Sequence, residues 1–197
     1  MKIGLFGGSF NPIHNGHIHL AKSIKDTFNL NKIIFIPSKK SPHKSNEEYV
    51  SNEHRLNMCR LAIQDIPNFE VSNFEISRDT ISYTIYTVRY FKSIYPNDEL
   101  YLLIGSDMLL SFDTWKNFKE IMQNVTLAVV SRENGDMSAL QEKANELSKY
   151  GKILIASVQP IEVSSTDIRK NIRFNKDYSC NLNKKVVQYI KSNGLYS

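Results

Sequence analysis

Short apolar runs alternate along this chain with longer segments in which apolar residues recur at helical spacing. Most of the runs are continuous and rich in Ile, Leu and Val, as is typical of strands that are covered on both faces. Strands are therefore predicted at 2–8, 32–37, 69–76, 99–105, 125–131 and 152–157. Helices are predicted near 16–28, 51–65, 83–95, 116–123 and 138–149, followed by a closing helix that ends near Gly194.

This alternation implies β-α-β units with right-handed crossovers, so the expected fold class is α/β with a mostly parallel central sheet and helices on both faces. A length of 197 residues suits a single domain, 1–197, whose C-terminal part, about 164–194, is helical. The third helix is expected to open at Ser82 and to stop before Pro96. Gly151 is expected to end the fifth helix in the left-handed conformation. Ligands of such a sheet bind beyond the carboxyl ends of its strands.

Composition narrows the classes of partner. The hydrophobic fraction of 41% and charged fraction of 23% are ordinary for a globular protein. The net charge of +5 suits small anions, although it equally suits a merely solvated surface. Without an arginine-rich tract, an apolar run of about 18 residues or a secretory signal, we expect no nucleic-acid partner, no membrane partner and a cytoplasmic location. Cys59 and Cys180 are expected to be reduced thiols.

The stretch "GGSFNPIHNGH", residues 7–17, follows the first predicted strand directly. Gly7 and Gly8 would let a phosphate reach backbone N–H groups, and Pro12 would stiffen the loop. A helix that starts near Asn15 would add its N-terminal dipole. His14 and His17 are three residues apart, so they can point to one side of its first turn and donate to phosphate oxygens.

Other readings of this stretch remain open. Two glycines after a strand can simply mark a tight turn, with no ligand involved. His14, His17 and His19 could bind a metal, but no carboxylate or cysteine ligand stands at a suitable spacing, and no metal site is predicted. The stretch is neither a Walker loop nor a G-x-G-x-x-G fingerprint.

A second polar stretch, "VSSTDIR" at 163–169, follows the last predicted strand. Ser164, Ser165 and Thr166 are natural N-cap residues, and Asp167 places negative charge in the first helical turn. An ordinary helix cap accounts for these residues alone. Arg169, one turn inside the helix, adds a guanidinium that can grip phosphates at two points.

Together, the two stretches resemble the nucleotidyltransferase superfamily, with an H-x-G-H motif at 14–17 and its second nucleotide-binding motif at 163–169. Over nearly the whole chain the sequence is similar to the bacterial nicotinate-mononucleotide adenylyltransferase family. Further matching pieces are "SPHK" (41–44), "SYT" (82–84), "IGSD" (104–107), "DTWKNF" (113–118) and Arg132. The resemblance implies a Rossmann-like nucleotide-binding fold.

The resemblance also implies a set of site residues. Those for ATP are Gly7, Gly8, Ser9, Phe10, His14, His17, Gly105, Asp107, Ser165, Thr166 and Arg169. Those for nicotinate mononucleotide are His43, Lys44, Thr84, Trp115, Lys116 and Arg132. His14, His17 and Arg169 would be catalytic, with His17 at the α-phosphate and the other two toward the β- and γ-phosphates. Gly105 and Asp107 would contact the ribose, Thr84 the carboxylate, and Trp115 the pyridine ring.

The implied reaction joins the adenylyl group of ATP to nicotinate mononucleotide, which gives deamido-NAD and pyrophosphate. Because the acceptor phosphate is already an anion, direct in-line attack needs no general base. Mg²⁺ would bridge substrate oxygens. The expected partners are ATP and nicotinate mononucleotide, and a homodimer is compatible with the sequence. The alternatives are transfer to nicotinamide mononucleotide or phosphopantetheine, a nucleotide-binding protein without turnover, and an RNA-binding or tRNA-charging fragment.

Some positions have plainer readings or depart from the family pattern. Trp115 can be a packing residue, Asp107 a helix cap, and Arg55 an anchor of its own helix. Many relatives have Pro-Pro-His where this chain has Ser41-Pro42-His43. Many also have an aromatic residue after the tryptophan, where Lys116 stands here, which leaves the second wall of the ring pocket open.

Overall fold

A six-stranded sheet with the order β3-β2-β1-β4-β5-β6 forms the centre of the computed structural model, which describes residues 1–39, 49–79, 81–131, 137–159 and 161–197. All five strand pairs are parallel. The strands are β1 (Lys2–Gly8), β2 (Lys32–Pro37), β3 (Phe69–Val71), β4 (Glu99–Gly105), β5 (Thr126–Ser131) and β6 (Ile153–Ser157). The expected α/β class is confirmed. From β1 the chain first builds the sheet outward to β2 and β3, and then continues on the other side of β1 with β4, β5 and β6.

Helices connect the strands and follow the last one. They are α1 (Asn15–Thr27), α2 (Asn52–Ile63), α3 (Thr84–Ile94), α4 (Ser106–Leu110), α5 (Phe118–Asn124), α6 (Met137–Leu147), α7 (Ser165–Arg173) and α8 (Lys184–Ser192). Short 3-10 turns lie at Phe112–Thr114, Ser148–Tyr150 and Ser179–Asn181. Among the described residues, no helix is long and apolar enough to cross a membrane.

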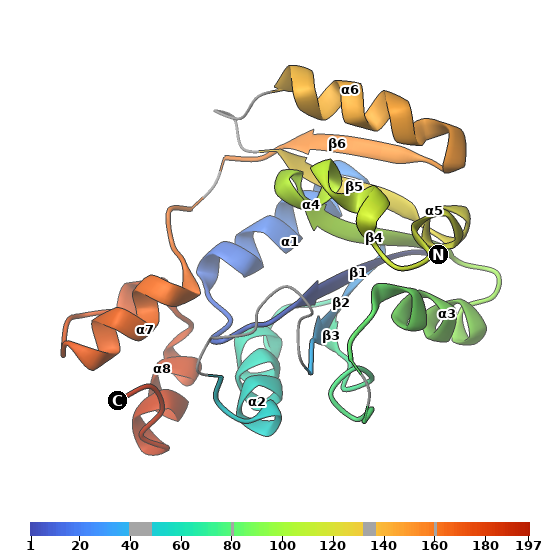
Figure 1. Cartoon of the computed structure of the whole chain (residues 1–197). Coiled ribbons are helices and arrows are strands. Elements are labelled where there is room, and N and C mark those ends of the chain that lie inside the picture. The colour runs from blue at the N-terminus through green and yellow to red at the C-terminus, as the bar shows by residue number, and fades with distance from the viewer. Residues whose placement is uncertain (40–48, 80, 132–136, 160) are drawn as a thin grey trace.

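The helices form two layers, one on each face of the sheet (Figure 1). α1, α2 and α8 bury side chains such as Ala21, Met58 and Ile190 in one hydrophobic cluster. α3, α5 and α6 bury others, such as Val88 and Ile121, in a second cluster on the opposite face. The sheet is therefore apolar on both sides, which explains the continuous apolar runs of the sequence.

Alternate residues of one strand supply the two clusters. In β4, Tyr101 and Leu103 belong to the cluster under α1 and α2, whereas Leu102 and Ile104 belong to the cluster under α3 and α5. Each fully buried side chain of this size contributes about 2 kcal/mol through removal of apolar surface from water. A polar residue at any of these positions would face a helix rather than water.

The predicted strand at 69–76 is too long, because β3 ends at Val71. The N–H of Ser72 still donates to the carbonyl of Phe35, but the next residues fold into turns. The N–H of Phe74 donates to Ser72 Oγ and that of Ser77 to the carbonyl of Asn73. These local hydrogen bonds by Ser and Asn replace the strand ladder. The third helix likewise begins at Thr84 rather than at Ser82.

Gly151 does not have the predicted left-handed conformation. Its φ of 171° is extended backbone, which any residue adopts. The glycine is required for another reason: a Cβ there would lie 2.2 Å from the carbonyl oxygen of Met122. The chain passes against α5 at this point, and only a residue without a side chain fits.

Candidate active site

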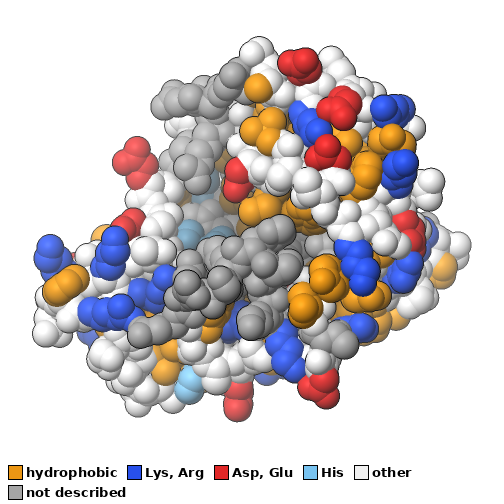
Figure 2. All heavy atoms as spheres, viewed as in Figure 1, with side chains coloured by type: hydrophobic (Ala, Val, Ile, Leu, Met, Phe, Trp, Pro, Cys, Tyr) orange, Lys and Arg blue, Asp and Glu red, His pale blue; other side chains and the backbone are white. Residues whose placement is uncertain are grey.

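Two cavities open beyond the carboxyl ends of the strands, on either side of the switch between β1 and β4. The histidine cavity, about 650 Å³, is lined by His14, His17, Arg169 and their neighbours. The tryptophan cavity, about 410 Å³, is lined by Thr84, Trp115 and their neighbours. Both volumes are in the range that holds small ligands. Figure 2 shows histidine side chains in the hollow of this face, with hydrophobic side chains beside them.

The two cavities adjoin. Ser9, after β1, and Gly105, at the end of β4, line both of them. The predicted ATP residues that line the histidine cavity are Ser9, Phe10, His14, His17, Gly105, Asp107, Ser165, Thr166 and Arg169. Gly7 and Gly8 instead line the tryptophan cavity. The topology thus joins the two motifs, which are separated by most of the sequence.

The loop after β1 is shaped by Phe10. Its backbone has a φ of +46°, in the left-handed region, and its ring is almost fully buried. The ring packs on Gly8, where a Cβ would lie 2.8 Å from Phe10 Cζ. A Cβ on Gly7 would meet nothing within 4 Å. Gly8 is therefore needed for the turn itself, while Gly7 borders open space.

The two histidines stack at the start of α1, which begins at Asn15 as predicted. Their ring centroids are 3.7 Å apart, and the N–H of His14 donates to Nδ1 of His17 over 3.2 Å. Because Nδ1 accepts, the neutral His17 ring carries its proton on Nε2, which makes that nitrogen a donor. The rings of Phe10 and His17 pack in a T-shaped arrangement, with centroids 5.1 Å apart. His17 thus has a fixed orientation and a defined tautomer.

His14 is buried, and its Nδ1 has no hydrogen-bond partner among the described residues. Burial lowers the pKa of His14 from its ordinary value of 6.5 to about 4. The ring is therefore neutral near pH 7. The ring lies against Gly16, where a Cβ would be only 3.0 Å from His14 Nδ1, so the glycine makes room for the histidine.

The neutral state of His14 predicts a loss of stability in mild acid. Below pH 6.5 this side chain becomes protonated in the unfolded chain while it stays neutral in the folded chain. The free energy of unfolding therefore decreases as the pH is lowered. Between pH 6.5 and pH 5 the loss from this residue is about 2 kcal/mol. Urea unfolding of the wild type and His14→Gln at both pH values measures it. The wild type should lose more stability than the variant, and an equal loss in both contradicts the assignment.

Arg169 connects α7 to the loop after β1. Its Nη1 donates to the carbonyl oxygen of Asn11 over 2.9 Å, and its Nη2 lies 3.4 Å from Thr166 Oγ1. Ser165 Oγ donates to the carbonyl of Pro12 over 2.9 Å. Ser164 is the N-cap of α7, because its Oγ accepts from the N–H of Asp167. The N-terminus of α7 therefore lies at the histidine cavity with a guanidinium beside it, an arrangement suited to anions.

His19 also lines the histidine cavity, but its side chain is bonded to the backbone of another segment. Its Nε2 lies 2.9 Å from the carbonyl oxygen of Gln159. In the described parts of the chain, no three His, Cys, Asp or Glu side chains converge on a metal position. Asp107 is in the first turn of α4, and its Oδ1 would lie 2.6 Å from a Cβ on Gly105. Its carboxylate therefore folds back over the end of β4.

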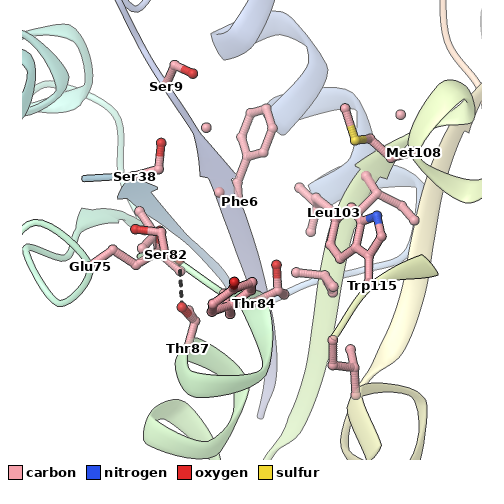
Figure 3. A pocket seen from close by; sticks show the side chains of 18 of the residues that line it. Phe6, Ser9, Ser38, Glu75, Ser82, Thr84, Thr87, Leu103, Met108 and Trp115 are labelled. Atoms are coloured by element: carbon pink, nitrogen blue, oxygen red, sulfur yellow. Dashed lines mark hydrogen bonds between the residues drawn. The ribbon is translucent and has the colours of Figure 1, made fainter. Parts of the chain in front are cut away.

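The tryptophan cavity has an apolar side and a polar side (Figure 3). Trp115 and Met108 lie on one side, Ser38 and Ser82 lie on the other, and Thr84 lies between them. The Trp115 ring packs on Phe112, with centroids 4.9 Å apart. Trp115 is half-buried, so it both joins the core and borders the cavity.

Lys116, where many relatives have an aromatic residue, also lines the tryptophan cavity. Its ammonium lies 4.5 Å from the centre of the Tyr83 ring and 3.1 Å from Tyr86 Oη. Tyr83, just before α3, is itself in the lining. An aromatic ring is thus supplied to this cavity from a different element, and Lys116 packs on that ring.

Sequence reasoning missed several polar residues around these cavities. Glu75 is buried in the wall of the tryptophan cavity and accepts from Thr87 Oγ1 over 2.6 Å. Burial raises its pKa, against the opposing effect of the Thr87 hydrogen bond. Arg55, expected to anchor its helix, is fully buried and donates to the carbonyl of Ser9 over 2.6 Å. The predicted residues His43, Lys44 and Arg132 lie outside the described residues.

Comparison with known proteins shows which family the chain resembles. The cytidylyltransferase-like family matches residues 5–171. A protein of Carboxydothermus hydrogenoformans named probable nicotinate-nucleotide adenylyltransferase is 41% identical over 197 residues, which cover 99% of this chain and 98% of the relative. The nicotinate-nucleotide adenylyltransferase of Bacillus subtilis is 36% identical over 195 residues, 99% of this chain and 98% of the relative. The chain therefore belongs to the nicotinate-nucleotide adenylyltransferase family, as the resemblance over nearly the whole sequence implied.

The fold agrees with that placement. A solved structure described as Plasmodium falciparum nicotinic acid mononucleotide adenylyltransferase complexed with NaAD superimposes with a TM-score of 0.79 at 20% identity. The match covers 99% of this chain and 97% of the other. At this identity, the likeness supports the Rossmann-like architecture and leaves the roles of individual residues to the geometry above.

Proposed function

We propose that this chain transfers the adenylyl group of ATP to nicotinate mononucleotide, with deamido-NAD and pyrophosphate as products. The observation that carries the proposal is the meeting of the two cavities at Ser9 and Gly105. ATP occupies the histidine cavity and the mononucleotide occupies the tryptophan cavity. The phosphate of one substrate and the α-phosphorus of the other then meet at the shared edge, as in-line attack requires.

Protein groups assist this reaction by positioning and by neutralising charge. Nε2–H of His17 donates to the α-phosphate, where negative charge grows during transfer. Arg169 and the start of α7 hold the β- and γ-phosphates, which leave as pyrophosphate. His14 also lines the histidine cavity and is the second proposed donor. The acceptor phosphate attacks as an anion, so no proton has to be removed from it first.

Mg²⁺ is the proposed companion of ATP. The described side chains offer Asp107 at the histidine cavity but no converging set of three ligands, which fits an ion held mainly by phosphate oxygens and water. When bound, the ion neutralises negative charge on the phosphates. Reaction rates with and without added Mg²⁺, after chelation, test this requirement.

The acceptor is recognised in the tryptophan cavity. Thr84 is the first residue of α3, where backbone N–H groups and the helix dipole favour a carboxylate. Trp115 stacks on the pyridine ring, and Lys116 adds positive charge at the lining. We also propose a homodimer, a cytoplasmic location and a single domain over 1–197.

Pyrophosphate release from ATP and Mg²⁺ tests the proposed function. Nicotinate mononucleotide, nicotinamide mononucleotide and phosphopantetheine are offered in parallel, and we expect strong preference for the first. Equal use of both pyridine nucleotides would mean that the start of α3 does not discriminate the carboxylate. ATP binding without release from any acceptor would support the nucleotide-binding protein without turnover instead.

Replacing Trp115 with alanine should mainly weaken acceptor binding. Loss of a stacked ring removes about 1–3 kcal/mol, so the KM for the mononucleotide should rise by about tenfold or more while the KM for ATP stays within twofold. Trp115→Phe keeps an aromatic face and should recover part of the loss. An unchanged mononucleotide KM in Trp115→Ala, with an unchanged melting temperature, would contradict stacking.

A further inference from the structure

The loop after β1, residues 9–12, is held from outside by donors to its carbonyl groups. The carbonyl of Ser9 accepts from Arg55 on α2, that of Asn11 from Arg169 and that of Pro12 from Ser165, both on α7. Phe10, inside the loop, has a positive φ that non-glycine residues rarely adopt. The loop therefore depends on these distant groups to keep its shape.

The side chain of Asn11 is a further anchor point of this loop. Asn11 is 1% exposed, and it lines the histidine cavity. Its Oδ1 accepts from Tyr196 Oη over 2.8 Å and lies 3.4 Å from the N–H of Val50. The tyrosine hydroxyl is the closer of these two donors to the buried amide oxygen, which lies at the wall of the proposed ATP site. A buried acceptor that loses its donor is costly, so this contact restrains the loop.

Tyr196 belongs to the closing segment, residues 193–197, which follows α8. The segment turns back toward the sheet through positive φ angles at Gly194 and Tyr196, +58° and +67°. Leu195 is buried in the core, and its N–H donates to the carbonyl of Ile190. Burial also raises the pKa of Tyr196, which keeps its hydroxyl protonated as a donor. The closing segment is therefore packed in place with its hydroxyl directed at Asn11.

We propose that Tyr196 is a positioning residue of the phosphate-binding loop: through Asn11, its hydroxyl holds residues 9–12 in the geometry that the transfer reaction needs. The inference rests on the proposed function, because the loop carries Ser9 and leads into His14. Tyr196 lines neither the histidine cavity nor the tryptophan cavity, so it acts through Asn11. Its effect is on the placement of the donors, where small displacements have large effects on rate.

α8 offers a matched control in Tyr189. The hydroxyl of Tyr189 lies 3.0 Å from His54 Nδ1 and accepts from Asn57 Nδ2 over 3.2 Å. Like Tyr196, it joins the C-terminal part of the chain to another element, in this case α2. Neither the residue nor its two partners lines the histidine cavity or the tryptophan cavity. Removing this hydroxyl therefore removes hydrogen bonds of similar kind without loosening the loop.

The test compares Tyr196→Phe with Tyr189→Phe in the full chain, using melting temperature, kcat and both KM values. Tyr196→Phe should lower kcat by about tenfold with the mononucleotide KM within twofold of wild type. Tyr189→Phe should keep kcat within twofold, whatever its melting temperature. A normal kcat in Tyr196→Phe, or an equal loss in both folded variants, would overturn the proposal.

Calorimetric titration with ATP alone separates this inference from the proposed function. If the wild type binds ATP but releases no pyrophosphate with any acceptor, the proposed function fails. The positioning role of Tyr196 is then tested by the Kd for ATP alone. Tyr196→Phe should then raise the Kd for ATP about fivefold, since the loop lines the ATP cavity, and Tyr189→Phe should not. Equal Kd values in the two variants would contradict the positioning role independently of turnover.

Discussion

Replacement of His17 by alanine is expected to lower turnover by about 10²–10³-fold, comparable to the loss of one donor from an oxyanion hole. The imidazole has a fixed tautomer and orientation, set by the N–H of His14 and the ring of Phe10. In the proposed role, it would stabilise the growing charge without first having to reorient. Rapid-quench or steady-state release of pyrophosphate under saturating substrates measures the effect.

His54→Ala is the matched control for this variant. His54 bonds Tyr189 and lines neither cavity, so its loss should leave turnover within about twofold. The melting temperature of His17→Ala should stay within a few degrees of wild type. Near-normal turnover in folded His17→Ala would remove this residue from the reaction.

Replacement of Arg169 by alanine is expected to lower kcat/KM for ATP by about 10²-fold. The guanidinium is proposed to hold the departing phosphates, and charge-assisted hydrogen bonds of this kind are worth about 1.5–3 kcal/mol. It also donates to the carbonyl of Asn11, so its loss removes a restraint on the loop as well. Competition binding of ATP and steady-state kinetics separate weaker binding from slower transfer.

Arg169→Lys should recover only part of this loss. Lysine keeps the charge but lacks the planar fork that reaches a phosphate and a carbonyl together. Arg173 lies one turn later on the same helix, is exposed and lines neither cavity, so Arg173→Ala removes an equal charge from α7 and should change kcat/KM by less than twofold. If Arg173→Ala and Arg169→Ala were equally impaired, the effect would be one of general charge rather than of a specific contact.

The sequence allowed the fold and much of the candidate site to be predicted because both have local signatures. Continuous apolar strands require cover on both faces, and parallel strands place their carboxyl ends at one edge. Residues 14–17 and 163–169 are each compact in sequence, so their chemistry could be recognised before their proximity was known. Because both stretches follow strands of one parallel sheet, they were expected at the same edge, and His17 and Arg169 indeed line one cavity.

The missed residues act through contacts that leave no periodic trace. Tyr196 meets Asn11 across 185 residues, and Arg55 meets Ser9 across 46. A single tyrosine or arginine in an amphipathic segment does not indicate which distant residue it will contact. Glu75 was missed for another reason: the alternating pattern of its neighbours is typical of a strand. Its carboxylate instead accepts from Thr87, after the chain has left the sheet at Val71.

The shared edge of the two cavities has a consequence for the product. With the proposed assignment of the two cavities, a dinucleotide would fill them as one molecule, whereas the substrates would fill them as two. The second half of the dinucleotide is presented at a high effective concentration once the first half is bound, so the whole should bind more tightly than either part. The edge that Ser9 and Gly105 share between the cavities would thus favour both the meeting of the reacting phosphates and retention of the product. Stable, linked analogues that span this edge are the natural inhibitors of such a site.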